Sequence, residues 1–312
     1  MVSLADIHAA RAVIGNRLLR TPVVPADWLA TGGARVSLKL ELFQRTGSFK
    51  PRGVLNALQA LPPDERPKGV ISISAGNHAQ ALAWAASAIG IPATVVMPAT
   101  AVRTKVEATR AWGGTVIQTE HDLLDTMQQV QRDRGLAFVH PFDDPNVIAG
   151  TGTLGLEVVE DAPDVDVVVV GCGGGGLLAG VATAVRAVRP TARIIGVEPR
   201  GADAMRQSLE RGEPVRLART NTVADGLAAP FAGLHTLAHV RAFVEEVVLV
   251  DDEEILDAMR QLIRRGRILP EPAAAAATAA LLAGRVRVSA KEHVVSVVSG
   301  GNADPELLRS LI

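Results

Sequence analysis

Cysteine and lysine are both scarce in this chain of 312 residues. Cys172 is the only cysteine, so no disulfide can form within the chain, and we expect a protein of a reducing compartment, the cytoplasm. All basic side chains other than five lysines and the histidines are arginines, so any chemistry that needs a primary amine has few candidates. The five lysines are Lys39, Lys50, Lys68, Lys105 and Lys291.

The chain has no excess of either charge. Lysine and arginine number 32 and aspartate and glutamate 33, which gives a net charge of -1. A dedicated binder of nucleic acid or of anionic membranes would show a basic surplus, so we expect neither partner. The scattered tryptophans suggest no platform for stacking bases. The histidines lack metal-ligand spacing with an acidic or cysteine partner, so no metal is predicted from them.

Hydrophobic runs typical of a signal peptide or a membrane span are also missing. Residues 1–19 are interrupted by charged side chains such as Asp6 and Arg11. The most apolar stretch, 165–185, is broken by the glycines at 171–176, which a strand, a turn and a helix explain better than a span. Because 48% of the residues are apolar, intrinsic disorder is excluded, and we expect a soluble cytoplasmic protein.

Short β-branched runs alternate with helical stretches along most of the chain. Nine runs are predicted to be strands: 36–42, 70–74, 93–97, 115–119, 137–141, 166–171, 193–198, 245–250 and 293–299. The helical segments between most of them indicate βαβ units and therefore parallel sheets. Breaks rich in proline and aspartate at 61–69 and 140–146 suggest a small α/β domain, 70–143, inserted into a larger domain made of 1–66 and 147–312.

Glycines dominate the segment 171–180, which follows a predicted strand. Successive backbone N–H groups of such a loop can turn toward one anion, and the helix expected at 177–189 adds the positive end of its dipole. A phosphate site is therefore predicted. The spacing GCGGGG also matches the dinucleotide pattern GxGxxG, with Glu198 as the acidic residue at the end of the next strand. This motif alone does not separate a phosphorylated cofactor from a dinucleotide.

Lys50 lies in TGSFKPRG (46–53), in a loop that leads into a helix expected to start near Pro51. The positive end of that helix should lower the pKa of Lys50 toward a neutral amine, the form that makes Schiff bases. The other lysines fit ordinary surface positions better. Lys39 alternates along a predicted strand, and Lys105 lies in the first turn of a predicted helix.

Two further polar motifs follow predicted strands. SAGNHAQ (74–80) opens an alanine-rich helix, where its serine, asparagine and histidine suit a carboxylate, although an ordinary helix cap explains them slightly better. VVSGGN (297–302) ends the last predicted strand and puts Ser299 at a carboxyl edge, where ligands of α/β sheets bind. A plain Gly-Gly turn explains that motif equally well.

Taken together and in this order, the motifs resemble the fold-type II pyridoxal-phosphate enzymes, in particular the threonine/serine dehydratase and serine racemase family. The resemblance runs from TPVV (21–24) to SGGN (299–302) and includes HPFDDPNVIAGTGT (140–153) and ADGLA (224–228). It implies a two-domain, three-layer α/β/α fold with mostly parallel sheets, similar to the tryptophan synthase β subunit. It also implies pyridoxal 5′-phosphate as the cofactor and a homodimer.

The resemblance further implies roles for individual residues. Phe49 would pack against the pyridine ring, Asn77 would hydrogen-bond the phenolic oxygen of the cofactor, and Ser299 would partner the pyridine nitrogen. Ser74 and His78, at the ends of the second motif, would hold the substrate carboxylate and so belong to the catalytic set. The phosphate would be held by the backbone N–H groups of Gly173, Gly174, Gly175, Gly176 and Leu177.

The implied activity is a β-elimination. Lys50 would hold the cofactor aldehyde as a Schiff base and then remove the proton from Cα of L-threonine or L-serine. Because Ser299 offers a hydroxyl rather than a carboxylate to the pyridine nitrogen, the ring is a weaker electron sink, which favours early loss of the β-hydroxyl. That hydroxyl needs a proton, with the cofactor phosphate as the expected donor. The products would be ammonia and 2-oxobutyrate or pyruvate.

Departures from the family pattern narrow this hypothesis. Racemases of the family resemble SSGNH at the second motif, whereas Ala75 stands in place of the second serine, so elimination should outpace racemisation. The family's divalent-cation site resembles a Glu, a carbonyl four residues later and an acid six residues later. Glu198 and Ala202 match, but Ala204 supplies no acid, so no metal is predicted. Because the chain ends soon after Asn302, no regulatory domain is expected.

Some alternatives stay open at this point. A serine racemase or a hydroxyaspartate dehydratase of the same family is one, and a NAD-binding dehydrogenase built on the glycines 171–176 is a more distant one. Glu271 either approaches the cofactor ring or simply starts a helix. Cys172 is expected to be a small buried hydrophobe rather than a nucleophile.

Overall fold

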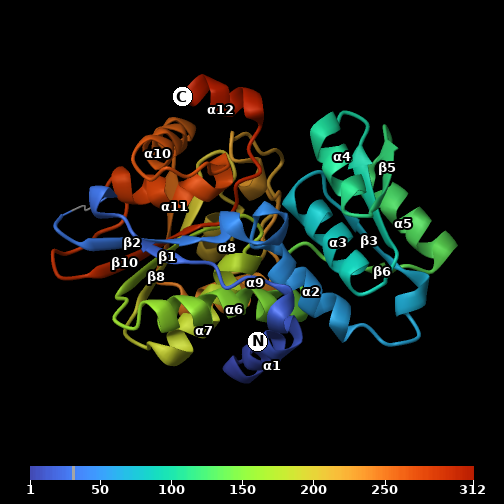
Figure 1. Ribbon diagram of the computed structural model, residues 1–312, viewed down its shortest axis with the longest axis horizontal. Coiled ribbons are helices and arrows are strands. Elements are labelled where there is room, and N and C mark those ends of the chain that lie inside the picture. Colours follow the sequence, from blue (N-terminus) through green and yellow to red (C-terminus); the bar gives the residue numbers. More distant parts are fainter. Residues whose placement is uncertain (30–31) are drawn as a thin grey trace.

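The computed structural model describes residues 1–29 and 32–312, and the chain folds around two β-sheets (Figure 1). The larger sheet has six strands in the order β1-β2-β10-β7-β8-β9, of which only β1 and β2 pair antiparallel. Its strands are β1 (Val23–Pro25), β2 (Arg35–Leu40), β7 (Val167–Gly171), β8 (Arg193–Pro199), β9 (Glu246–Val250) and β10 (His293–Val298). The smaller, all-parallel sheet has the order β5-β4-β3-β6, with β3 (Val70–Ile73), β4 (Ala93–Pro98), β5 (Thr115–Thr119) and β6 (Ala137–Phe138).

All nine predicted strands are present, and the predicted α/β architecture with mostly parallel sheets is confirmed. The largest difference in bounds is at 137–141, where β6 ends at Phe138. Among the described strands, β1 is the one that the sequence did not predict. It has three residues and ends in Pro25, so it shows no alternation, and as an edge strand it tolerates proline.

Helices cover both faces of the larger sheet, which gives three layers (Figure 1). Val167 and Val169 of β7 pack with the alanines 273–277 of α11 on one face, and Val168 and Val170 pack with α6 and α7 on the other. Successive side chains of a strand point to opposite faces, so a strand covered on both faces is apolar throughout. The helices are α1 (Leu4–Ile14), α2 (Lys50–Ala60), α3 (Asn77–Ala88), α4 (Arg103–Ala111), α5 (Leu123–Arg134), α6 (Pro145–Asp161), α7 (Gly176–Val188), α8 (Ala204–Arg211), α9 (Leu234–Phe243), α10 (Asp252–Arg264), α11 (Pro272–Leu282) and α12 (Pro305–Leu311).

Helix α2 lies at the junction between the two sheets (Figure 1). Its Val54 and Leu58 belong to the same hydrophobic core as the side chains of β3 and β4. The packing around the smaller sheet therefore extends beyond residues 70–143. The division into a domain of 1–66 and 147–312 and an inserted domain of 70–143 stays a prediction.

The apolar stretch 165–185 forms β7, a glycine loop and most of α7, as the sequence predicts. Among the described residues, no helix is both long and apolar enough to cross a membrane. Because β7 ends and α7 begins on either side of the glycines, the loop has the strand-to-helix geometry that a phosphate site requires.

Candidate active site

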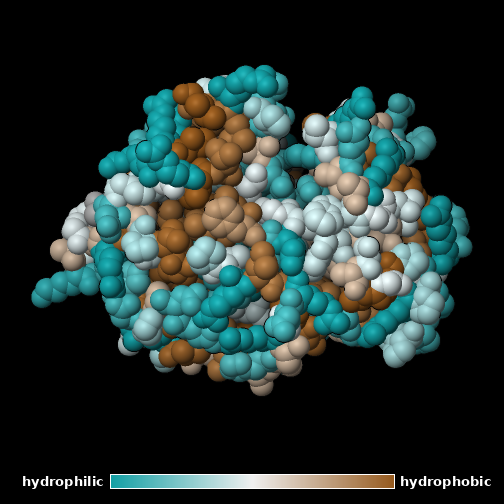
Figure 2. Space-filling model, in the orientation of Figure 1, coloured by the Kyte–Doolittle hydropathy of each residue, from teal (hydrophilic) through white to brown (hydrophobic). Residues whose placement is uncertain are grey.

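A cavity of about 480 Å³ lies between the two sheets, at the carboxyl ends of β3, β7 and β10. Figure 2 shows the surface hollowed between the part of the molecule built on the larger sheet and the part built on the smaller one. All four sequence motifs contribute to the cavity wall. The wall residues from these motifs are Phe49, Lys50, Ser74–His78, Gly171, Gly173–Leu177, Ser299 and Asn302. Every site residue predicted from the sequence therefore lines the same cavity.

Lys50 is the first residue of α2, and its half-buried side chain faces the cavity. Its Nζ donates a hydrogen bond to the carbonyl of Pro141 (2.9 Å) and lies 5.1 Å from the centre of the Phe49 ring. Burial lowers the pKa of Lys50 to about 8, and the nearby carboxylate of Glu271 opposes this shift. The predicted direction is right, but the main cause is loss of water around the ammonium rather than the end of a helix.

The glycine loop presents a row of free N–H groups at the start of α7. Within the part of the chain that the structure describes, no backbone acceptor is present for the N–H groups of residues 173–177. Gly175 adopts φ +93°, which favours glycine, and a Cβ on Gly174 would lie 2.5 Å from the ring of Phe142. The loop is therefore closely packed against Phe142. Its free backbone N–H groups suit a phosphate bound at a helix N-terminus.

The second motif brings Ser74 to the cavity wall. The imidazole of His78 points toward the buried side chain of Ser72. The Oγ of Ser74 accepts the N–H of Gly76 (3.1 Å). The Nε2 of His78 lies 3.0 Å from the Oγ of Ser72, which itself donates to a backbone carbonyl. Burial lowers the pKa of His78 to about 3, so its ring stays neutral. This geometry favours a role for the start of α3 in binding a carboxylate. It does not favour general acid–base catalysis by the imidazole of His78.

Glu271 contributes a buried carboxyl group to the cavity wall. It immediately precedes α11, and its Oε1 accepts a hydrogen bond from the Nδ2 of Asn77 (2.6 Å). Burial, together with the negative charge of Asp225, raises the pKa of Glu271 to about 7. Glu271 therefore starts a helix and also faces the cavity, and its approach to the cofactor ring stays a prediction.

Several wall residues were not predicted from the sequence. Pro141 and Phe142 lie in HPFDDPN, and Asp225 lies in ADGLA, two segments that carried the resemblance without a role for these residues. Lys105 also lines the cavity, and its Nζ pairs with the carboxylate of Asp225, another wall residue. Lys105 lies in the first turn of α4, as predicted, but its place in the cavity wall was not predicted. Only the contact between α4 and the 224–228 segment reveals this pair.

Glu198 and Cys172 are buried and are not among the described residues that line the cavity. The Glu198 carboxylate accepts the backbone N–H groups of Met205 (2.8 Å) and Arg206 (2.9 Å) at the start of α8, so it is not placed to hold a ribose. Burial raises the pKa of Cys172 well above its ordinary value, so the thiol is a buried hydrophobe, as predicted. The described residues contain no group of three or more metal-ligating side chains.

The cavity thus combines an amine of lowered pKa with a helix N-terminus of free N–H groups, as a pyridoxal-phosphate site needs. The family model described as pyridoxal-phosphate dependent enzyme matches residues 15–300 of the chain. The chain belongs to this family. Pyridoxal phosphate is therefore the cofactor of this pyridoxal-phosphate dependent enzyme, as predicted from the sequence, and the dinucleotide alternative is wrong.

Similar proteins agree with this assignment. Two L-threonine ammonia-lyases, from Thermotoga maritima and Geobacter sulfurreducens, are 42% and 45% identical to this enzyme, over 100% of this chain and 78% of each relative. The solved structure of maize serine racemase has a TM-score of 0.94 and 37% identity, over 99% of this chain and 96% of that one. The threonine deaminase of T.th. has a TM-score of 0.90 and 40% identity, over 97% and 99%. The predicted three-layer fold of the pyridoxal-phosphate enzyme is confirmed.

Proposed function

We propose that this pyridoxal-phosphate enzyme is an L-threonine/L-serine dehydratase (ammonia-lyase), which forms ammonia and 2-oxobutyrate or pyruvate. The observation that carries the proposal is that the Lys50 amine and the N–H groups of the glycine loop face one cavity. Relatives named L-threonine ammonia-lyase, at 42% and 45% identity, support a small hydroxy-amino acid as the substrate.

The residues of the cavity fit the cofactor. The free N–H groups of 173–177 suit its phosphate, Phe49 its ring, Asn77 its phenolic oxygen and Ser299 its pyridine nitrogen. When bound, pyridoxal phosphate withdraws electrons from the Cα–H bond of an amino acid and so makes that proton acidic. Lys50, with a pKa of about 8, is suited to accept this proton near neutral pH and to hold it at Nζ.

The remaining wall residues direct the reaction toward elimination. The start of α3, from Ser74 to His78, suits the substrate carboxylate, because its first N–H groups point to the helix N-terminus. Ser299 brings a hydroxyl, which does not keep a pyridine nitrogen protonated as a carboxylate would. A weaker electron sink favours rapid loss of the β-hydroxyl over slow reprotonation at Cα.

A panel of amino acids assayed for ammonia release tests the proposal. We expect release from threonine and serine by a yellow protein whose colour borohydride fixes onto Lys50. Lys50→Ala should lose at least about 10²–10⁴-fold of this activity, the share typical of a positioned acid–base group. Full turnover by that variant, or a wild-type protein that stays colourless with added pyridoxal phosphate, would overturn the proposal.

Serine racemisation is the second candidate, because maize serine racemase has nearly the same fold. Ala75 lines the cavity in place of the second serine of SSGNH and offers no acid–base group to the opposite side of Cα. We therefore expect pyruvate to form faster than D-serine in chiral analysis of serine incubations. Ala75→Ser should raise the share of D-serine. Hydroxyaspartate in the amino-acid panel tests the remaining alternative within the family.

We also propose that the enzyme is a homodimer. Figure 2 shows a hydrophobic patch on the side of the molecule that carries α11 and α12. Phe43 and Leu269 are among the exposed large hydrophobic residues, with 51% and 50% of their surface exposed. Large exposed apolar patches mark interaction surfaces. Light scattering tests this proposal, and a mass of 32.6 kDa, that of one chain, would contradict it.

We propose a cytoplasmic location and no nucleic-acid or membrane partner. The free, buried thiol of Cys172 and the net charge of -1 support this. Fractionation of cells, with the activity measured in each fraction, tests the location.

A further inference from the structure

A chain of hydrogen bonds connects four separate segments beside the cavity. The Nδ2 of Asn302 donates both to the backbone carbonyl of Thr46 (2.7 Å) and to the Oδ1 of Asn77 (2.8 Å). The Nδ2 of Asn77 donates in turn to the Oε1 of Glu271 (2.6 Å). The chain therefore starts at a carbonyl four residues before Lys50 and ends at a buried carboxyl group.

The direction of these bonds follows from their first member. A backbone carbonyl only accepts, so the side-chain nitrogen of Asn302 must face Thr46, and its second N–H then faces Asn77. Asn77 must therefore accept this hydrogen bond with its side-chain oxygen, so its side-chain nitrogen faces Glu271. An amide nitrogen carries two hydrogens, and Glu271 uses one of them. The second N–H of Asn77 is left for a partner in the cavity, whose wall Asn77 helps to form.

The backbone around Thr46 is built for this contact. Thr46 has φ +60°, which is uncommon for a residue with a side chain, and Gly47 follows with φ +72°. A Cβ on Gly47 would lie 2.7 Å from the Oδ1 of Asn302, so only glycine lets Asn302 approach. The N–H of Gly301 donates to the carbonyl of Gly47 (2.9 Å), which ties the two segments together. Such backbone strain persists where the surrounding structure over-determines it, often at functional sites.

We propose that Asn302 and Glu271 are positioning residues that fix the amide of Asn77, so that its second N–H points at the phenolic oxygen of bound pyridoxal phosphate. The inference rests on the proposed function and adds to it two residues that act through Asn77. A donated hydrogen bond stabilises the ionised form of an acceptor oxygen. The bonds on either side of Asn77 therefore set the pH at which the absorption band of the bound cofactor changes.

Asn302→Asp is the sharpest test, because it keeps the shape of the side chain and removes its donors. Asn77 would then turn its nitrogen toward position 302 and its oxygen toward the cavity. We expect the apoenzyme of this variant to bind pyridoxal phosphate about tenfold more weakly, the loss of about one hydrogen bond, and to shift the pH midpoint of the absorption band. Asn221→Asp, at an exposed asparagine outside the cavity wall, makes the same change in charge and should show the wild-type midpoint.

Glu271 supplies a second, independent pair of variants. Glu271→Leu removes the acceptor at the far end and should shift the midpoint in the same direction as Asn302→Asp. Glu271→Gln keeps an oxygen that can accept from Asn77 and should recover most of the wild-type midpoint. This pair decides the matter if Asn302→Asp fails to fold by circular dichroism. A merely structural role would change stability but leave the midpoint unmoved.

Two outcomes overturn the inference: a folded Asn302→Asp enzyme with the wild-type midpoint and affinity, or Glu271→Leu with the wild-type midpoint. Failure of the proposed function looks different. In that case the wild-type protein itself would bind pyridoxal phosphate without releasing ammonia from threonine or serine. The measurements of cofactor binding and of the pH midpoint on the variants could still be interpreted, because they do not depend on catalytic turnover.

Discussion

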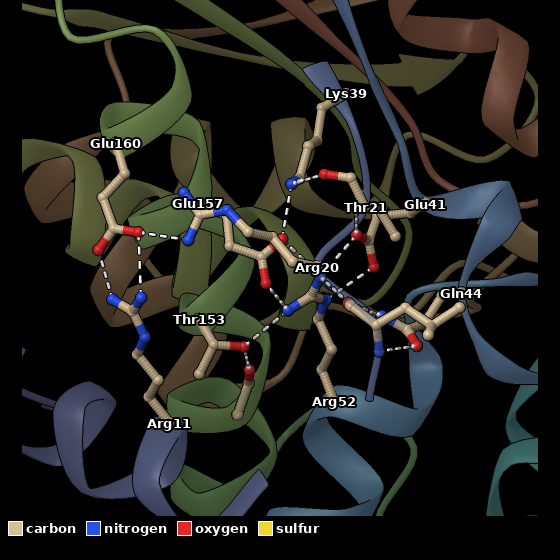
Figure 3. A network of polar contacts seen from close by, with 12 residues as sticks. Arg11, Arg20, Thr21, Lys39, Glu41, Gln44, Arg52, Thr153, Glu157 and Glu160 are labelled. Atoms are coloured by element: carbon tan, nitrogen blue, oxygen red, sulfur yellow. Dashed lines mark hydrogen bonds and ion pairs between the residues drawn. The ribbon is translucent and has the colours of Figure 1, made fainter. Parts of the chain in front are cut away.

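Two basic side chains in the first turn of α2, Lys50 and Arg52, belong to two groups of ionisable residues whose pKa values shift in opposite ways. Arg52 belongs to a fully paired network with Glu41, Glu157 and Lys39 (Figure 3), which we call the ionic network. Lys50, two residues earlier, faces the cavity with no carboxylate in ion-pair contact among the described residues. The backbone is shared, so the difference between the two groups comes from their partners.

In the ionic network each charge meets its opposite at hydrogen-bond distance. Arg52 donates to both oxygens of Glu41 (2.8 Å each) and to both oxygens of Glu157 (2.8 and 2.9 Å), and Lys39 donates to Glu157 (2.6 Å). Burial alone would lower the pKa of Arg52 and raise that of Glu157. The opposite charges outweigh it, so the pKa of Arg52 is raised and that of Glu157 is lowered. Arg52 and Glu157 therefore stay charged, and the ionic network connects β2, α2 and α6.

In the cavity, burial has a larger effect on the pKa values than the neighbouring charges have. It brings the pKa of Lys50 to about 8 and that of Glu271 to about 7, close to the pH at which an enzyme works. The comparison teaches that incomplete pairing, rather than burial as such, makes a buried group able to exchange a proton. The variants below test this difference between paired and unpaired groups.

Arg52→Met should have the largest effect. It leaves the carboxylates of Glu41 and Glu157 buried without their shared cation, which costs about 3–5 kcal/mol of unfolding free energy. Urea unfolding followed by circular dichroism measures the loss. Arg52→Lys should lose less, because an ammonium keeps the charge but cannot bond both carboxylates twice. A loss below about 1 kcal/mol for Arg52→Met would show that the network does not clamp the fold.

Lys50→Met should have the opposite sign and stabilise the apoenzyme. The pKa of Lys50 is about 8 in the fold against 10.5 when unfolded, so below pH 8 the folded state bears the full penalty of a buried ammonium. At pH 7 we expect a gain of about 3 kcal/mol for the variant. Between pH 8 and 10.5 the folded wild-type loses its proton first, its stability rises, and the gain should vanish. Urea unfolding at pH 7, 9 and 10.5 checks this, and a gain that grew with pH would contradict it.

Lys39→Met removes a smaller part of the ionic network. Lys39 bonds the carbonyl of Thr21 and the carboxylate of Glu157, and Arg52 still neutralises Glu157 in the variant. We expect a loss of about 2 kcal/mol, the value of hydrogen bonds to a charged donor. The same urea experiment measures it. A loss as large as that of Arg52→Met would mean that the two cations do not share the carboxylate as the geometry indicates.

Glu210→Gln should have the smallest effect. It breaks the pair with Arg206 (2.8 Å) on the exposed face of α8. Exposed i,i+4 pairs contribute at most about 0.5 kcal/mol, and salt screens them. The unfolding midpoint should therefore stay near the wild-type value at 0.5 M salt. A clear destabilisation there would break the distinction between exposed and buried pairs.

Much of the cavity wall could be predicted because its amine and its phosphate-binding glycines each lie in a short, recognisable sequence segment. Lys50 stands between an aromatic and a proline at a helix start, and four consecutive glycines follow the buried strand β7. Those features are local, so no partner is needed to recognise them. Lys39 shows the limit. Its place in an alternating strand suggested an ordinary surface lysine, whereas it is fully buried beside Glu157, 118 residues away.

Local features of the sequence identified the segments that line the cavity, because the effects of glycine, proline and the order of strands and helices extend over only a few residues. Which charges are paired depends instead on how distant segments pack in the folded chain. The partners of Arg52 come from the turn that follows β2 and from α6, and the partners of Asn77 from the loop after β10 and from the residue before α11. Whether a buried basic side chain is ion-paired depends on its distance to a carboxylate, and that distance is set only after distant segments have packed together.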